Sequence, residues 1–198
     1  MITKAPIIPN AVMLDRVLGE IQRGLTGGLD WLDAAFGRCQ RIVKTIDGKR
    51  YITPNVYCGG LEGKGKNDYI EVSPDSHIGN FSFFVIHDPQ IVDTFAGQPA
   101  EIKAPFSLIF WFDLRIIFGS DTNRNTELIK AQIMKILNGR TAWHLQGGRI
   151  IINKTYEQAQ NIYSGFTLDE NDNQFLMHPF GGLRFDGIIE YTEYCYDE

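Results

Sequence analysis

Few residues of this chain have the types and spacing that catalysis requires. His87 is followed by Asp88 at the expected end of a strand, and a carboxylate beside a histidine can orient it as a general base. A hydrolase also needs an activated serine or cysteine, and none stands in a recognisable nucleophile turn. The remaining histidines, at positions 77, 144 and 178, form no pair at metal-ligand spacing. We therefore predict no catalytic residue and no enzyme, with a small hydrolase built on His87 as an open alternative.

A glycine- and lysine-rich loop at residues 59–66 partly matches a phosphate-binding loop. Residues 60–66 have the spacing G-x-x-x-x-G-K, but Asn67 stands where a serine or threonine would hold magnesium. The stretch that follows, 68–72, has the pattern of a strand, whereas the motif requires the start of a helix. The sequence therefore predicts a flexible, solvated loop without a cofactor, in which Lys64 and Lys66 are available to contact a partner.

The polar residues Asp169, Asn171 and Asn173 resemble the start of a calcium-binding loop. Gln174 replaces the glycine that such a loop requires, and position twelve is Phe180, which supplies no carboxylate. A polar turn explains these residues, and we expect no metal site.

Composition limits the classes of protein to which the chain can belong. Its 198 residues are 43% hydrophobic and 22% charged, which is ordinary for one globular domain spanning 1–198. A net charge of −5 is unfavourable for direct binding to nucleic acid. Three widely spaced cysteines indicate reduced thiols, and the most apolar stretch is too short to cross a membrane. We expect a soluble protein that is made in the cytoplasm.

The most apolar stretch, residues 106–118, alternates with the period of a strand. Every even position is apolar, so this face should belong to the core beneath a layer of helices. The odd positions include Trp111, Asp113 and Arg115, which predicts a face that is only partly covered. Because aromatic residues and arginine are enriched in interfaces, these three side chains are the predicted subunit contact.

The other elements give an α+β fold with a mixed, mainly antiparallel sheet and helices packed on one face. Asp47 and Gly48 form a strong two-residue hairpin turn. An extended arm is expected at residues 1–10, and flexible loops at 59–66 and 90–105. The expected helices are 11–25, 30–36 and 128–137, with a helical turn at 155–163. The expected strands are 41–57 (a hairpin), 68–72, 81–87, 106–118 and 183–196, and 150–152 is a short apolar run.

This order of elements resembles that of the tail-terminator (tail-completion) proteins of long-tailed bacteriophages, the minor tail protein U type. The parts that carry the resemblance are the helix 11–25, the strand and helix at 106–118 and 128–137, and the closing segment 179–191. The resemblance implies a structural protein that forms a ring, such as a hexamer, which caps the tail tube and joins it to the head. Its partners would be itself, the tail-tube protein and the head connector, in the host cytoplasm and then in the virion tail.

Three alternatives remain beside a tail terminator. The additional segments 47–48, 59–66 and 139–182 leave room for a neighbouring role in the neck, as a head–tail joining protein. A small-ligand-binding module between the helices and the sheet is the second alternative, and the His87 hydrolase is the third. The sequence names neither a ligand nor a substrate.

Overall fold

The computed structural model describes residues 4–59, 69–74, 77–94, 98–120, 122–138, 148–168 and 174–193. The helices within these ranges are α1 (Met13–Gly28), α2 (Leu114–Phe118), α3 (Thr126–Leu137) and α4 (Ala159–Ile162). The strands are β1 (Ala34–Arg38), β2 (Gln40–Ile46), β3 (Lys49–Tyr57), β4 (Tyr69–Glu71), β5 (Phe81–Ile86), β6 (Ile91–Asp93), β7 (Ala100–Asp113), β8 (Arg149–Tyr156) and β9 (Phe180–Glu193). The predicted loop at 59–66 and the calcium-like segment 169–173 lie almost wholly outside the described residues.

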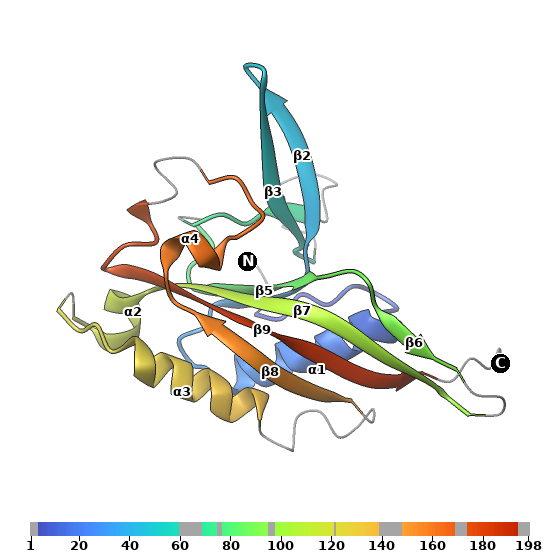
Figure 1. The fold of residues 1–198 in the computed structure, drawn as a ribbon. Coiled ribbons are helices and arrows are strands. Elements are labelled where there is room, and N and C mark those ends of the chain that lie inside the picture. Colours follow the sequence, from blue (N-terminus) through green and yellow to red (C-terminus); the bar gives the residue numbers. More distant parts are fainter. Residues whose placement is uncertain are drawn as a thin grey trace.

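The main sheet is built around two long strands. β7 and β9 pair antiparallel along their whole length, from Ala100 opposite Glu193 to Asp113 opposite Phe180. The strand order is β1-β5-β7-β9-β8. β5 and β6 lie along the same edge of β7, β6 beside its first residues and β5 beside its later ones. Only β1 and β5 run parallel. The predicted α+β fold with a mixed, mainly antiparallel sheet is confirmed (Figure 1).

The two long helices lie on one face of this sheet. The even-numbered residues of β7 point toward them, and Phe106, Leu108, Phe110 and Phe112 are all buried there. α1 contributes Leu18, Ile21 and Leu25 to the same core, and α3 contributes Ile129 and Ile133. The expectation that the even face of this strand is core beneath helices is confirmed for residues 106–112 and is wrong at Ile116, which is 61% exposed.

The odd face of β7 is covered from within the chain, which differs from the prediction of a partly open face. A second core forms around Phe83, Ile109 and Trp111, and Ile162 of α4 and the following Tyr163 pack against it. The sheet therefore separates two apolar clusters, one beneath α1 and α3 and one beneath α4 and the adjacent loops. Neither cluster was visible as a separate unit in the sequence.

The strands β2 and β3 form the expected hairpin, with Asp47 and Gly48 at positive φ of 50° and 75° in the turn. We call residues 40–57 the projecting hairpin, because β2 and β3 point away from the main sheet (Figure 1). Its base is anchored where Val56 enters the second core, whereas every residue of β2 is exposed. β4 adds a third strand along β3.

Three predicted boundaries are wrong, and each has a physical reason. Residues 30–36 were expected to form a helix, but Ala34 begins β1, because the carboxylate of Asp33 accepts a hydrogen bond from the Asn80 amide (2.8 Å) and draws the chain beside β5. The long strand ends at Asp113 and not at 118, because that side chain caps α2. The expected loop at 90–105 contains β6 and the first residues of β7.

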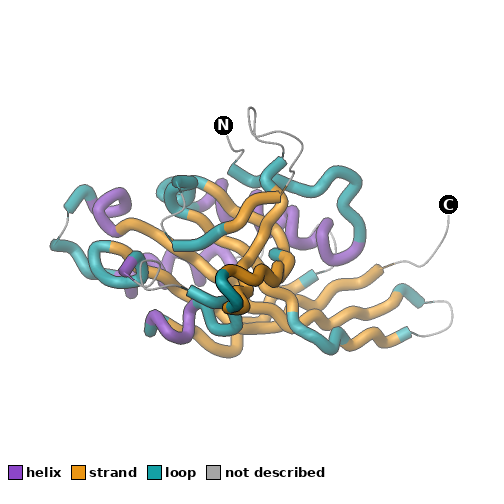
Figure 2. The backbone as a smooth tube through the Cα atoms, turned by 90° about the horizontal axis from the view of Figure 1, so that it is seen from above, coloured by secondary structure: helices purple, strands orange, loops and turns teal. Residues whose placement is uncertain are grey.

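Residues 4–12, at the expected N-terminal arm, have no long regular element and lie against α1. The side-chain amide of Gln22 donates to the carbonyl oxygens of Pro6 (2.9 Å) and Ala35 (2.8 Å), which ties this segment to the helix and to β1. Figure 2, which looks down on the molecule, shows the end of the main sheet that holds β6 extending past the helices, as does Figure 1. Among the described residues no helix is long and apolar enough to cross a membrane.

Candidate functional site

Trp111, predicted to form part of a subunit contact, is a core residue. Only 5% of its surface is exposed, and its indole N–H donates to the carbonyl oxygen of Phe175 at 2.7 Å. Its ring is stacked between those of Phe81 and Phe180, with centroids 5.6 Å away on each side. The sequence-based expectation of an accessible tryptophan on this strand is therefore wrong, because the loop before β9 folds over it.

Asp113 and Arg115 form an ion pair at the junction of β7 and α2. The Arg115 guanidinium donates to both carboxylate oxygens, with Nη2 2.7 Å from Oδ2, and the backbone N–H of Arg115 donates to Oδ1 at 2.9 Å. These hydrogen bonds lower the pKa of Asp113, and the carboxylate caps the short helix. Arg115 also lies over the ring of Phe180, 5.1 Å from its centroid. Asp113 is buried, so only Arg115 offers an exposed surface to a partner.

The other two predicted contact residues, Lys64 and Lys66, lie outside the described residues. The structure therefore brings together Trp111, Asp113 and Arg115 around Phe180, and it leaves their relation to the two lysines untested. As a group, the three described residues join the end of the sheet to α2, which is a structural role.

His87 belongs to a polar array that the sequence did not reveal. The array consists of His87, Ser107, Asp186 and Arg184, on β7, β9 and the end of β5. His87 Nε2 lies 2.7 Å from Ser107 Oγ, and Ser107 Oγ donates to Asp186 Oδ1 at 2.7 Å. Arg184 donates to both oxygens of Asp186, at 2.7 and 3.0 Å. The expected pairing of His87 with Asp88 is replaced by this chain of hydrogen bonds across three strands.

The order of the polar array differs from that of a serine hydrolase. There the serine gives its proton to histidine, and the carboxylate holds the other nitrogen of the ring. Here the Ser107 hydroxyl donates its hydrogen bond to Asp186, so His87 must donate its Nε2–H to Ser107 Oγ. Ser107 is also 1% exposed. This arrangement holds three strands together and does not present an activated nucleophile.

The electrostatics of the polar array keep its charges fixed near neutral pH. Burial lowers the pKa of His87, and the positive charge of Arg184 lowers it further. Burial raises the pKa of Asp186, but the hydrogen bonds from Arg184 and Ser107 outweigh it, so the pKa is lowered overall. The histidine is therefore neutral, while the aspartate is charged and paired with arginine.

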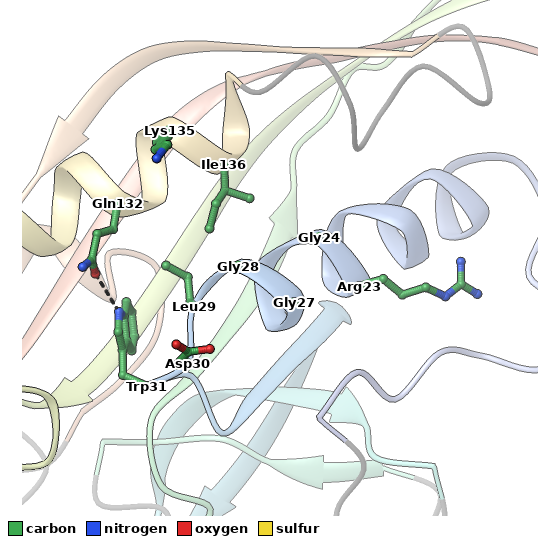
Figure 3. Close-up of a pocket in the computed structure, with 10 residues that line it drawn as sticks. All are labelled: Arg23, Gly24, Gly27, Gly28, Leu29, Asp30, Trp31, Gln132, Lys135 and Ile136. Atoms are coloured by element: carbon green, nitrogen blue, oxygen red, sulfur yellow. Dashed lines mark hydrogen bonds between the residues drawn. The ribbon is translucent and has the colours of Figure 1, made fainter.

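A groove of about 870 Å³ lies between the C-terminal end of α1 and α3 (Figure 3). At one end of the groove Trp31, which follows α1, is bonded to α3, because its indole N–H donates to Gln132 Oε1 at 3.0 Å. Its ring packs edge-on against Phe112 of the sheet, 5.9 Å between centroids. Arg23, Asp30 and Lys135 lie along the groove, so charges of both signs border it. The described residues contain no group of three His, Cys, Asp or Glu side chains that could hold a metal ion.

The projecting hairpin is one of the exposed apolar features of the described chain. The exposed fractions are 37% for Ile42, 50% for Val43 and 52% for Ile46. Val43 points to one face of the hairpin and the two isoleucines to the other, because side chains alternate along a strand. β2, with branched apolar residues on both faces, belongs to neither core of the described chain. Comparison with known proteins finds no matching family model and no matching curated protein.

Proposed function

We propose that this protein works by assembly, as a structural protein of a phage or prophage tail that forms a ring, terminates the tail tube and joins it to the head. The observation that supports this best is the projecting hairpin. Its apolar side chains, Ile42 and Ile46 on one face and Val43 on the other, are exposed in one chain, and exposed apolar surface of this kind is typical of a protein-binding site. Its outer strand also has an open edge, which natural proteins usually protect unless it pairs with something.

Two further features agree with this proposal. The order of elements on which the resemblance to tail terminators rests includes the long strand, the helix after it and the closing strand, which correspond to β7, α3 and β9. The net charge of −5 favours protein partners over the phosphates of nucleic acid. The partners would be other copies of this chain, the tail-tube protein and the head connector, first in the bacterial cytoplasm and then in the virion tail.

The mass of the purified protein in solution tests the proposal. A single chain has a mass of 22.5 kDa, and light scattering over a range of concentrations should give a discrete multiple of it, six-fold for a hexamer. Electron microscopy should then show the particle at one end of tail tubes that no longer lengthen. A mass of one chain at every concentration, together with no effect on tube growth, would contradict the proposal.

A further inference from the structure

Two edge strands of the described chain expose isoleucine and valine on an open edge. Among the described strands, β2 pairs only with β3, and β6 pairs only with β7. On β6, Ile91 is 53% exposed and Val92 is 55% exposed, values close to those of Val43 and Ile46 on β2. Each edge has unpaired backbone groups beside branched apolar side chains, which is the combination that accepts a further strand.

The two edges carry opposite charge. Residues 40–57 hold four cations and one acid, a net charge of +3. Because the whole chain has a net charge of −5, the residues outside this hairpin have a net charge of −8. Lys49 and Arg50, near the tip of the hairpin, are exposed and form no ion pair with any residue that the structure describes. The projecting hairpin is therefore a basic element on an acidic protein.

The edge at β6 is acidic, and its charges are uncompensated within the described ranges. Asp93 on β6 lies directly opposite Glu101 on β7, and Asp88 precedes the strand. Like charges directly opposite one another destabilise a sheet, so this pair gains from a cation supplied from outside. Lys103 lies two residues beyond Glu101 on the same face, yet the described residues show no ion pair between them.

From this complementarity we infer that the projecting hairpin of one copy pairs with the β6 edge of a second copy, so that β2 and β6 become neighbouring strands across the interface. The inference rests on the proposed function and names the contact surface. Within one chain the hairpin points away from the main sheet, while β6 lies along its edge, so the contact requires another copy (Figure 1). Backbone hydrogen bonds and apolar side chains would hold the strands. Lys49 and Arg50 lie on β3, one strand from the contact and on opposite faces, so one of these two cations would lie on the same face as the acidic pair Asp93 and Glu101.

This contact joins two different surfaces. Each copy keeps one free hairpin and one free β6 edge after it has bound a neighbour. Such a heterologous contact continues from copy to copy until it closes into a ring, or it extends as a filament if it does not close. Because β6 spans only three residues, charge contributes much of the recognition, and the assembly should weaken as salt is raised.

Charge reversal tests the contact. The hairpin variant carries Lys49→Glu and Arg50→Glu, and the edge variant carries Asp93→Lys and Glu101→Lys. In each variant alone, the projecting hairpin and the β6 edge carry charges of the same sign. Light scattering at low salt should therefore give the mass of a single chain, 22.5 kDa. An equal mixture of the two variants should assemble again, with the variants alternating. One chain with all four substitutions should also assemble.

A control variant with the same change in net charge as the hairpin variant is Arg124→Glu with Lys154→Glu, at exposed positions before α3 and on β8. It should keep the mass of the unmodified protein, and circular dichroism should show that every variant is folded. If the unmodified protein assembles and neither reversal changes its mass, or if the mixture stays as single chains, the hairpin-to-β6 contact is wrong while the proposed function stands. If the unmodified protein never assembles, both are wrong.

Discussion

The polar array shows how burial and a neighbouring arginine hold one histidine neutral. His87 is partly buried beside Arg184, and both effects disfavour its protonated form. Its hydrogen bond to Ser107 does not require a second proton on the ring. The folded state therefore favours the neutral form of His87, and protonation of His87 lowers the stability of the three strands that the polar array joins.

We expect the proton resonances of His87 to titrate with a midpoint below the ordinary value of 6.5. Because the folded chain binds this proton less readily than the unfolded chain, the contribution to the free energy of unfolding is present above pH 6.5 and is lost as the pH falls through the lowered pKa. NMR titration measures the midpoint, and urea unfolding at several pH values measures the stability. The variant Arg184→Met should raise the midpoint, and a midpoint of 6.5 or higher in the unmodified protein would contradict the assignment.

At the scale of the elements, Gly187 permits the close approach of β8 to β9. A Cβ atom placed there would lie 2.1 Å from the carbonyl oxygen of Ile151 and 3.1 Å from the ring of Phe106. The register of β8 against β9 shifts just beyond this point, between Ile152 and Lys154. The backbone of the neighbouring strand therefore occupies the space that a side chain would need.

The variant Gly187→Ala should lower the free energy of unfolding by about 1–3 kcal/mol, the usual cost of overpacking. Gly27→Ala is the matched control, since no atom lies within 4 Å of its Cβ position, and it should raise the stability by about 0.5–1 kcal/mol as a helix residue. Chemical denaturation of the three proteins measures both changes. Equal stability of the two variants would contradict the close approach at Gly187.

The elements that the sequence predicted well are those whose pattern is local. The stripe of α3 and the Asp47-Gly48 turn depend on neighbours within a few residues, and both are present in the structure. Residues 34–38 became a strand because of a contact with Asn80, far along the chain, which no local pattern shows. Likewise, the strand ends at Asp113 because its side chain caps the next helix, where alternation alone predicts a longer strand.

The polar array was missed for the same reason. Ser107 and Asp186 are ordinary residues in their own strands, and they meet only because the register of β7 and β9 places them opposite each other. The apolar residues of β2 were predicted only as part of a hairpin, and their pattern is that of any hairpin. They are exposed because the hairpin points away from the main sheet, and no local sequence pattern shows the direction of a hairpin.

At the scale of the whole molecule, the projecting hairpin and the main body have separate tasks. The body holds two apolar cores on opposite faces of one sheet, and β2 belongs to neither of them. Residues that contact no core contribute little to stability, usually within about 0.5 kcal/mol for an exposed position. Loss of the apolar side chains of β2 should therefore prevent assembly while the chain still folds.

The triple variant Ile42→Ser, Val43→Thr, Ile46→Ser should unfold at nearly the same denaturant concentration as the unmodified protein, but its mass in solution should fall to that of one chain. The core variant Phe84→Ala is the comparison, because it removes a fully buried ring and should cost about 3–5 kcal/mol. Light scattering and denaturation on the same samples measure both properties. A triple variant that assembles normally would exclude these side chains from the contact.

The junction between β1 and β2 sets the direction of the projecting hairpin. Only Cys39 separates the two strands, and its backbone N–H still donates to the carbonyl oxygen of Phe84 in the main sheet, at 2.7 Å. The direction of the hairpin is held here and at β3, where the backbone N–H of Ile52 donates to the Thr167 hydroxyl at 3.1 Å. In an assembly joined through the hairpin, that direction determines the rotation from each copy to the next, and so the number of copies in a closed ring. A different bend at Cys39 would change the diameter of the ring while every contacting side chain stayed the same.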